Sequence, residues 1–377
     1  MILTGSKNNA GDFLIKHRAK KLFEAIRPDR EIIDFNAWEP INEKKLDVIN
    51  QSKCLILMGG PALQKNMYPG IYKLTENIDE IKVPITTMGI GWKSQRGNWK
   101  DTYDYPLSDT TLKLLDRIKS GGLKASVRDF HTLNALGFKG YDNFLMTGCP
   151  AYYDLEQIEK EFEFPQEIKK VAFSLGVSFI NSPSMEQQIK TQILSLRERF
   201  KHNDFEVVFH HSLDKIKFMQ AHGSALKHNQ RHNEFADWLT KQNIGFVDIS
   251  GSAENLINYY LKVDLHIGYR VHAHIFMNSI KKLTLLISED GRAKGSQSAI
   301  NGMVVDGYHD TKEHLVFKVL NRLGLPVDRF HSNEHSNEEI QQSLNYEFNT
   351  GGHRSSQASA LIKENFKIMH VFLKNLP

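Results

Sequence analysis

Cysteine is nearly absent from this chain of 377 residues, which holds only Cys54 and Cys149. Two cysteines this far apart, both in apolar surroundings, form neither a disulfide framework nor a zinc spacing. Long apolar runs are absent too, since none approaches the ~18–20 residues of a membrane span. The first residues, MILTGSKNNAGD, lack the basic and apolar regions of a signal peptide. We therefore expect a cytoplasmic protein.

The chain also lacks a large excess of either sign of charge. Lysine and arginine number 48 against 44 aspartate and glutamate residues, and no run of five basic residues occurs. We therefore expect no nucleic-acid partner. The mild excess of +4 suits an anionic small substrate. It would equally suit an anionic membrane surface, so peripheral membrane association stays open.

Short apolar runs alternate with amphipathic stretches along the whole chain. Apolar residues in the stretches recur at intervals of three and four, as in helices. The alternation favours βα units and parallel sheets. The charged stretch 154–170 interrupts it and is typical of a linker. The predicted strands are MILTG, EIIDF, CLILMGG, PITTMGIG, KASVRD and NFLMTG before the linker, and VAFSLGV, EVVFHH, GFVDIS, VDLHIGY, LTLLIS and MVVDGY after it.

At about 150 residues per domain, this length predicts two domains. We expect an α/β fold in which two Rossmann-like domains, residues 1–155 and 165–350, face each other across a cleft. Residues 332–355 are polar and predict a mobile loop. Residues 355–377 predict a helix opened by serine caps, with a long apolar stripe. Open α/β sheets bind ligands at the carboxyl ends of their strands, so the cleft is the expected site.

Two loops of the first domain follow predicted strands. In GSKNNAGDFLI, a polar loop leads into a helix that begins at Asp12. A turn with an aspartate cap explains this pattern as well as a site at which Asn9, Gly11 and Asp12 line the cleft. In LMGGPAL, Gly59 and Gly60 would let a ligand approach the backbone, and the proline after them suits a first helical turn.

Basic side chains follow strands in three places. Arg128 ends SVRD, where either a surface pair with Asp129 or a ligand explains it. Arg292 and Lys294 follow LTLLIS, where an ordinary charged loop is the alternative. Arg270 precedes a predicted helix, whose dipole already attracts anions. An arginine there indicates a bound carboxylate or phosphate that both would attract.

The segment DLHIGYRVHAHIF contains three histidines among core-like residues. Arg270 and His272 fall at its strand-to-helix turn, where the cleft should lie. The pair His272 and His274 would share a face only on a strand, and a catalytic zinc needs a third protein ligand. We therefore expect no metal. Most of the 17 histidines suit the surface or a satisfied core position, and His272 is the exception because it lies beside Arg270.

Together these motifs resemble the polysaccharide pyruvyl transferase family over roughly residues 1–305. NNAGD resembles the family's N-x-G-D loop and LMGGPAL its glycine-rich loop, while MGIGW, SVRD and TGCPA follow in family order. GYRVHAHIF resembles the R-L-H segment, and EDGRAKG stands where the family has an aspartate and a lysine. This chain has GGP for GGG, R-V-H for R-L-H, and Arg292 at the lysine position. An arginine keeps the charge there but changes its geometry.

The resemblance implies a glycosyltransferase-B-like pair of domains, with the last helix crossing back to the first domain. It implies transfer of pyruvate from phosphoenolpyruvate to two hydroxyls of a saccharide, which forms a cyclic ketal in surface polysaccharide biosynthesis, with no cofactor. His272 would be the general acid. The implied donor ligands are Arg128, Arg270, Arg292 and Lys294, and the expected acceptor side comprises Asn9, Gly11, Asp12, Gly59 and Gly60. The acceptor's carrier, a lipid or a nucleotide, stays open.

Two other functions stay open. A glycosyltransferase of the same fold would use a basic loop to bind the diphosphate of a nucleotide sugar. A non-catalytic carbohydrate-binding protein would keep the fold without the reaction. The donor discriminates among them, because phosphoenolpyruvate should raise the thermal stability of a pyruvyl transferase where nucleotide sugars should not.

Overall fold

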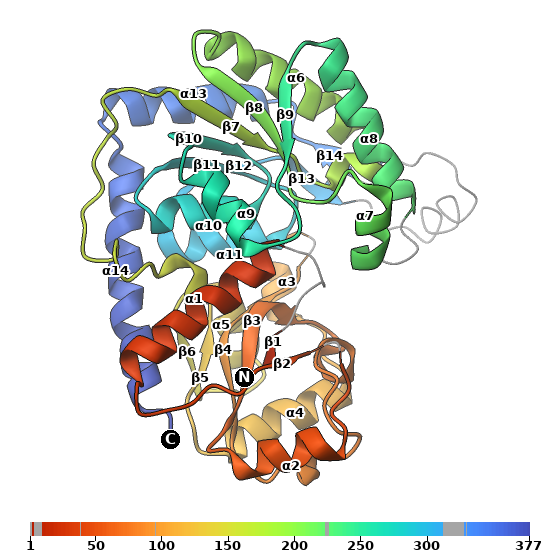
Figure 1. The fold of residues 1–377 in the computed structure, drawn as a ribbon, viewed down its shortest axis with the longest axis vertical. Coiled ribbons are helices and arrows are strands. Elements are labelled where there is room, and N and C mark those ends of the chain that lie inside the picture. The colour runs from red at the N-terminus through yellow and green to blue at the C-terminus, as the bar shows by residue number, and fades with distance from the viewer. Residues whose placement is uncertain are drawn as a thin grey trace.

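The computed structural model describes residues 2–3, 10–37, 39–94, 96–222, 226–311, 328 and 330–377. These residues form two parallel sheets of six strands each, one above the other in Figure 1. The strand orders are β2-β1-β3-β4-β5-β6 and β12-β11-β10-β7-β8-β9. The predicted α/β class, with two Rossmann-like units in a glycosyltransferase-B-like arrangement, is confirmed.

The first half of the chain builds the lower sheet and its helices. Its elements are β1 (Ile2–Leu3), α1 (Ala10–Ile26), β2 (Phe35–Asn36), α2 (Glu43–Gln51), β3 (Leu55–Leu63), η1 (Met67–Ile71), η2 (Ile78–Glu80), β4 (Ile85–Trp92), α3 (Trp99–Tyr103), α4 (Asp109–Ser120), β5 (Ala125–Val127), α5 (Phe130–Gly137), β6 (Phe144–Met146) and η3 (Pro150–Tyr152).

The second half builds the upper sheet, a small hairpin and the two last helices. Its elements are β7 (Lys170–Ser174), η4 (Ser178–Asn181), α6 (Pro183–Arg199), β8 (Asp204–Phe209), α7 (Lys215–His222), α8 (Leu226–Lys241), β9 (Gly245–Asp248), α9 (Ala253–Tyr260), β10 (Leu265–Gly268), α10 (Val271–Ser279), β11 (Leu283–Ser288), α11 (Gly291–Ile300), β12 (Met303–Asp306), β13 (Tyr308–Thr311), β14 (Phe330–Ser332), α13 (Ser336–Asn349) and α14 (His353–Lys374).

The central strands are buried on both faces. Every residue of β4, β10 and β11 is buried, as is all of β3 except a half-buried Pro61. Burial of both faces explains why these strands are continuous apolar runs instead of alternating patterns. The buried apolar side chains cluster around both sheets, and one cluster extends across the boundary between the halves.

The strand orders determine where a ligand can enter each sheet. Counted from β7, the upper sheet has the order 3-2-1-4-5-6 of dinucleotide-binding Rossmann sheets, and its order reverses between β7 and β10. The lower sheet reverses between β1 and β3. Ligands of open parallel sheets bind beyond the carboxyl ends of the strands at such reversals. The loops after β1, β7 and β10 are therefore the expected binding loops.

The polar segment 332–355 forms a helix, α13, and the prediction of a mobile loop there was wrong. Ile340, Leu344 and Glu347 are buried on one side of this helix. The Glu347 carboxylate accepts hydrogen bonds from the start of α14. Three buried positions at helical spacing were hidden among the polar residues that cover the exposed side.

Pro61 does not begin a helix, as its position after two glycines suggested. It lies inside β3, where the pairing with β4 shifts register between Gly60 and Leu63. A bulge of this kind accommodates a proline because the ladder is already interrupted there. Gly60 has a φ of 84°, which a side chain would disfavour.

The last helix, α14, contacts elements of both halves. It packs on α1 and β6 of the lower half and on α10, α11 and α13 of the upper half, along the left side of Figure 1. Its buried stripe includes Ala358, Ile362, Met369 and Phe372. The expected domain boundary between residues 155 and 165 stays a prediction. Among the described helices, none combines the length and the apolar character that crossing a membrane requires.

Candidate active site

The two halves meet where the loop after β4 contacts the start of α11. The Gly291 N–H donates to the Ser94 carbonyl at 3.0 Å, and the Trp92 indole N–H donates to the Gly291 carbonyl at 3.2 Å. A Cβ on Gly291 would lie 2.8 Å from the Ser94 Cβ, so a side chain there would separate the two backbones. These contacts bring α11 against the carboxyl edge of the lower sheet.

Arg128 directly follows β5 at that edge. Its side chain lies against Gly91 of β4, because a Cβ on that glycine would lie 2.0 Å from the Arg128 Nε. Asp129 caps α5 by accepting the Thr132 N–H at 2.7 Å, and its Oδ2 lies 3.7 Å from the Arg128 Nε. Both side chains are buried, which excludes the surface ion pair. The Nη1 and Nη2 atoms of Arg128 have no hydrogen-bond partner among the described residues.

Arg270 lies just past β10, where the upper sheet reverses its order. Its backbone N–H donates to the Ser174 Oγ at 3.1 Å, and its Nε donates to the Leu175 carbonyl at 2.6 Å. Its Nη2 is buried and, within the described part of the chain, has no hydrogen-bond partner. The guanidinium is thus held through Nε while its outer end still has a hydrogen bond to donate.

His272, in the first turn of α10, contacts the first half of the chain. A Cβ on Gly11 of α1 would lie 1.9 Å from the His272 Nδ1, so the imidazole packs directly on that glycine. Burial first, and then the charges of Arg128, Arg292 and Arg270, lower the pKa of His272 to about 3. Three guanidinium groups therefore lie near one imidazole. The His272 Nε2 is buried with no hydrogen-bond partner among the residues described.

Arg292 and Lys294 lie in the first turn of α11 but point to different partners. Arg292 binds Asp290 through Nε at 2.8 Å and Nη2 at 2.7 Å, and the Asp290 charge raises the pKa of Arg292. Burial alone would raise the pKa of Asp290, but the charge and hydrogen bonds of Arg292 hold it below its ordinary value. The Lys294 Nζ lies 2.5 Å from Asp306 Oδ1, so this lysine forms an ion pair with Asp306.

Glu289 is a buried residue of this region to which the sequence reasoning assigned no role. Its Oε2 accepts the N–H groups of Val177 at 2.7 Å and Ser178 at 3.0 Å. That loop also contains Leu175, whose carbonyl holds Arg270. Burial raises the pKa of Glu289, and the charge of Arg270 opposes the rise. The sequence pattern that singled out Arg128, a charged residue directly after a predicted strand, also applies to Glu289.

The sequence reasoning assigned His210 no donor or catalytic role, although this residue directly follows β8. Its Nε2 lies 2.8 Å from the Tyr260 hydroxyl. Burial lowers the pKa of His210 well below its ordinary value, and Arg270, His266 and His272 lower it further. His210 therefore belongs to the same region as Arg270, as a neutral imidazole.

The other two histidines of the segment that contains His272 are core residues. His266 shares hydrogen bonds with the Ser174 Oγ and the Thr284 Oγ1, both at 2.8 Å. His274 lies 3.0 Å from the same Thr284 oxygen. Both side chains are fully buried. Their polar atoms are satisfied inside the second half, so they need no ligand.

The structure brings Gly11, Arg128, Arg270, His272 and Arg292 into one region. Asp12 is buried in the first turn of α1, and its charge raises the pKa of Arg292, which places it there too. Gly59 and Gly60 instead lie inside β3. A Cβ on Gly59 would lie 2.9 Å from the Gly89 carbonyl, so close strand packing accounts for this glycine. Asn9 lies outside the described residues.

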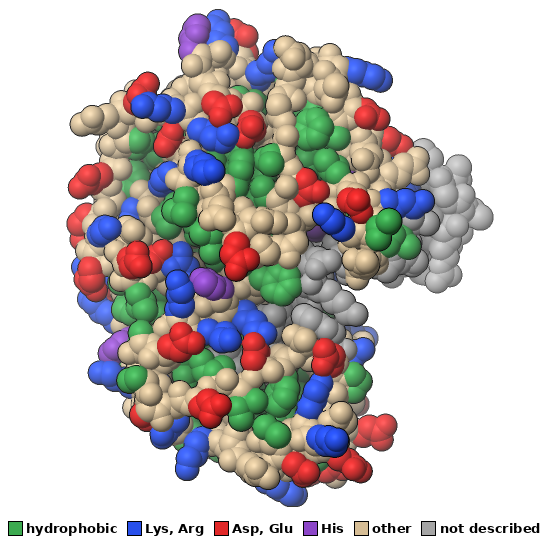
Figure 2. Space-filling view, viewed as in Figure 1, with side chains coloured by type: hydrophobic (Ala, Val, Ile, Leu, Met, Phe, Trp, Pro, Cys, Tyr) green, Lys and Arg blue, Asp and Glu red, His purple; other side chains and the backbone are tan. Residues whose placement is uncertain are grey.

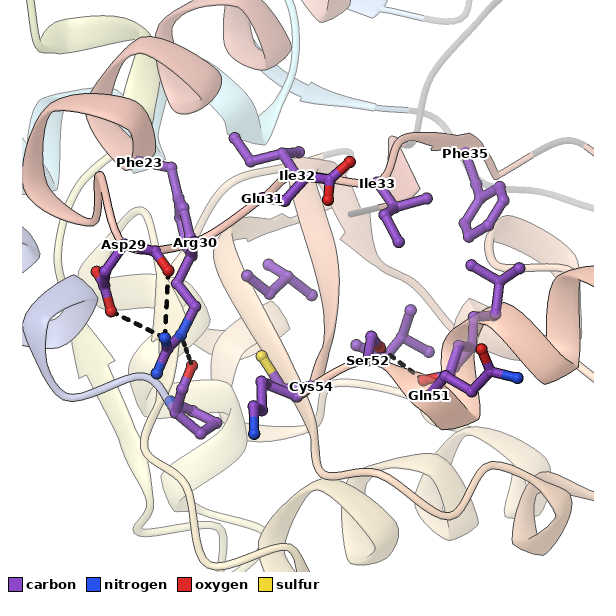
Figure 3. Close-up of a pocket in the computed structure, with 16 residues that line it drawn as sticks. Phe23, Asp29, Arg30, Glu31, Ile32, Ile33, Phe35, Gln51, Ser52 and Cys54 are labelled. Atoms are coloured by element: carbon purple, nitrogen blue, oxygen red, sulfur yellow. Dashed lines mark hydrogen bonds and ion pairs between the residues drawn. The ribbon is translucent and has the colours of Figure 1, made fainter.

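The molecule is hollowed on one side, between its upper and lower halves (Figure 2). A separate cavity of about 330 Å³ lies at the opposite edge of the lower sheet, lined by Phe23, Ile33 and Phe35, with the Cys54 sulfur pointing into it (Figure 3). The four cations considered above, Arg128, Arg270, Arg292 and Lys294, do not line that cavity. Over the part of the chain that the structure describes, no group of three histidine, cysteine or acidic side chains is placed to hold a metal ion.

Two Rossmann-like sheets with facing carboxyl edges define a glycosyltransferase-B-like α/β protein. Residues 9–276 match the family described as polysaccharide pyruvyl transferase. This match covers more than half of the chain, which therefore belongs to the polysaccharide pyruvyl transferase family. Membership implies a transferase with a saccharide acceptor.

The search of curated proteins found no match. Among solved structures, the chain is similar to UDP-GlcNAc 2-epimerase from Neisseria meningitidis bound to UDP-GlcNAc, at 12% identity and a TM-score of 0.45, over 96% of this chain and 89% of that one. It is also similar to UDP-GlcNAc 2-epimerase from Methanocaldococcus jannaschii in complex with UDP-GlcNAc and UDP, at 11% identity and a TM-score of 0.45, over 92% and 99%. At these scores neither likeness carries a conclusion about ligand or reaction.

Proposed function

We propose that this protein transfers pyruvate from phosphoenolpyruvate to two hydroxyls of a saccharide and so forms a cyclic ketal. The observation that carries the proposal is the set of buried nitrogens without partners among the described residues. These are Arg128 Nη1 and Nη2, Arg270 Nη2 and His272 Nε2. Buried polar nitrogens without a partner are rare in folded proteins, and a bound ligand or an ordered water usually satisfies them.

Phosphoenolpyruvate suits these donors because it has a carboxylate and a phosphate on a three-carbon frame. Guanidinium groups bind both anions through charge-assisted hydrogen bonds, which are shorter and stronger than neutral ones. Arg128 comes from the first half and Arg270 from the second, so a donor bound by both also joins the halves. Arg292, fixed by Asp290, adds positive charge from the start of α11. Donor roles for these three arginines and for Lys294 stay predictions.

The reaction begins when protonated His272 gives its proton to the methylene carbon of the donor. The resulting cation at C2 is attacked by one saccharide hydroxyl, and phosphate leaves with the electron pair of the C2–O bond. The second hydroxyl then attacks C2 and closes the ketal. One hydroxyl proton restores His272 and the other leaves on hydrogen phosphate. The balance is phosphoenolpyruvate plus a diol to a pyruvate ketal plus hydrogen phosphate.

The protonation state of His272 couples donor binding to catalysis. Without a donor, burial and three guanidinium charges hold its pKa at about 3, so the imidazole is neutral near pH 7. A donor with two anionic groups among these cations would raise that pKa, because an opposite charge within about 4–6 Å favours the charged form. The donor would thus bind together with a proton, and the acid would be charged only when its substrate is present.

Three substitutions at two residues separate the roles of acid and donor ligand. His272→Gln keeps a hydrogen-bond donor but cannot give up a proton, so phosphate release at saturating donor should fall ~10²–10⁴-fold. Its donor affinity, measured by calorimetry, should change little. Arg270→Ala should weaken donor binding together with turnover, and Arg270→Lys should rescue only part, because an ammonium lacks the planar fork. Near-wild-type turnover in His272→Gln would show that His272 is not the acid.

A nucleotide-sugar glycosyltransferase is the second candidate. The upper sheet has the strand order of dinucleotide-binding sheets, and its reversal point lies beside Arg270. Thermal denaturation with each ligand distinguishes the two. We expect phosphoenolpyruvate to raise the melting temperature of the wild-type protein and not that of Arg270→Ala. A rise with uridine or guanosine diphosphate sugars, and none with phosphoenolpyruvate, would favour the glycosyltransferase.

A further inference from the structure

Three exposed aromatic rings form a continuous surface on α3 and at the carboxyl end of α5. Trp99 is 48% exposed, Tyr103 54% and Phe138 59%. The ring centroids of Trp99 and Tyr103 are 6.1 Å apart, and those of Tyr103 and Phe138 are 4.9 Å apart. We call these three residues the aromatic surface. An exposed contiguous apolar patch of this kind is often a functional part of a protein surface.

The clustering is not a general property of this protein's exterior. The described residues include six exposed side chains of phenylalanine, tyrosine or tryptophan, and four of them lie on α3, on α5 or directly after α5. The fourth is Phe130, the first residue of α5. The remaining two, Phe246 and Tyr346, lie on separate elements of the upper half. A selective concentration on two short helices calls for a specific occupant.

The aromatic surface is continuous with the candidate active site. Its Trp99 ring lies 4.6 Å from the His131 ring, and His131 stacks at 4.7 Å on Trp92 with an angle of 5° between the planes. Trp92 donates its indole N–H to Gly291, at the start of the helix that contains Arg292. His131 lies two residues after Asp129, the neighbour of Arg128. Stacked rings therefore lead from the exterior to the seam between the halves.

We propose that the aromatic surface binds sugar units of the acceptor saccharide beyond the unit that receives pyruvate. This inference rests on the proposed function and adds that the acceptor is an oligosaccharide or a polymer. A sugar ring presents a flat face of C–H groups with its hydroxyls at the rim. Such a face packs on the electron-rich face of an aromatic ring. The exposed Lys93 and Lys100 on the same segment can donate hydrogen bonds to the hydroxyls at the rim.

The size of the aromatic surface favours a saccharide over a second protein. An aromatic side chain buries about 150–250 Å² when it is wholly covered, and each of these rings is only about half exposed. Three such rings therefore offer roughly 200–400 Å². A stable protein interface buries about 1,200–2,000 Å² in total, which is roughly 600–1,000 Å² on each partner. Two or three consecutive sugar rings match the smaller area.

Direct binding by the full-length protein tests this inference. The probes are purified oligosaccharides of one to six units, in β-1,4-glucose, β-1,4-N-acetylglucosamine, α-1,4-glucose, β-1,4-mannose and β-1,4-galactose series, together with a broad glycan array. In at least one series we expect the affinity to rise with length from two to four units. Trp99→Ala and Tyr103→Ala should each lower the affinity for the longer members at least tenfold. Trp99→Phe, which keeps a ring, should retain most of it.

Tyr346→Ala is the matched control, because it removes an exposed ring of similar size from α13. It should bind every glycan as the wild type does, and all variants should keep the same melting temperature and the same affinity for phosphoenolpyruvate. Glycan binding that Trp99→Ala leaves unchanged would overturn the inference. So would the absence of binding to any glycan, dissociation of an oligomer by Trp99→Ala, or ring-dependent binding to phosphatidylglycerol vesicles instead of glycans.

The two proposals can fail separately. Tryptophan-dependent glycan binding without phosphate release from phosphoenolpyruvate would support the aromatic surface and count against the pyruvyl transfer. Phosphate release that depends on His272, with acceptors of one unit used as well as longer ones in both wild type and Trp99→Ala, would support the transfer and overturn the aromatic surface.

Discussion

Gly11→Ala should damage catalysis although alanine is the better helix former. Gly11 is the second residue of α1, where replacing glycine by alanine would ordinarily stabilise a helix by about 0.5–1 kcal/mol. The added Cβ, however, would lie 1.9 Å from Nδ1 and 2.3 Å from Cγ of His272. Contact at 3.4–4 Å is ordinary, so the imidazole or the whole helix must move by roughly 1.5 Å.

The size of the effect follows from this displacement. A shift of about 1 Å in a catalytic group can cost ~10²-fold in rate. We therefore expect turnover of Gly11→Ala to fall about 10²-fold, and its unfolding free energy to fall by about 1–3 kcal/mol from overpacking. Donor affinity should change much less, because Arg270 is held by Ser174 and Leu175 and not by Gly11.

The assay is phosphate release from phosphoenolpyruvate, beside chemical denaturation and donor calorimetry. Gly137→Ala is the matched control, because no heavy atom lies within 4 Å of where its Cβ would be. It should keep wild-type turnover. If Gly11→Ala also keeps wild-type turnover and stability, Gly11 and His272 do not touch in the working enzyme, and the site that joins the two halves is refuted.

Two further predictions follow from the charges around this site. Glu289→Ala should weaken donor binding about tenfold, because it frees the Val177 and Ser178 N–H groups and loosens the loop that holds Arg270; Glu289→Gln, whose amide oxygen can accept the same bonds, should restore it. Donor calorimetry checks this, and unchanged binding by Glu289→Ala would exclude the positioning role. Burial holds the pKa of His272 and of His274 at about 3, so below pH ~6.5 the unfolded chain binds protons that the folded one does not. Each of these two histidines should therefore lower the free energy of unfolding by about 2 kcal/mol when the pH falls from 6.5 to 5, at ~1.4 kcal/mol per pH unit. Denaturation at both pH values measures the loss, and equal stability at the two would contradict these buried neutral states.

Much of the fold was predictable because its signals are local. All twelve strands of the two sheets overlap predicted apolar runs. The match is clearest for central strands such as β4 and β11, because burial on both faces needs continuous apolar sequence. Arg128, Arg270 and Arg292 were predicted to share a region because each follows a strand, and the carboxyl edges of the two sheets were expected to face each other across a cleft. The prediction failed at 332–355, where buried positions are sparse, and at Pro61, whose place in a bulge depends on its partner strand.

The partners of the site residues were not predictable from local pattern. In the sequence, Gly11 and Gly59 both lie near the end of a predicted strand. In the structure, Gly11 meets the His272 side chain, whereas Gly59 meets the neighbouring strand β4. Lys294 and Arg292 are two residues apart in a helix, yet they point to Asp306 and to Asp290. Such choices depend on side-chain direction and on neighbours far away in the chain.

The sequence by itself determined the two parallel sheets and placed cations after their strands, because hydrophobic period and chain order are properties of neighbouring residues. Only the tertiary structure decided that Gly11 packs on His272, that Arg128 and Arg270 keep buried donors without partners among the described residues, and that Glu289 supports the loop behind Arg270. The contact between Gly11 and His272 joins residues about 260 positions apart, and it exists only after the two halves have docked. Docking depends on the shapes of two finished surfaces, which no short stretch of sequence contains.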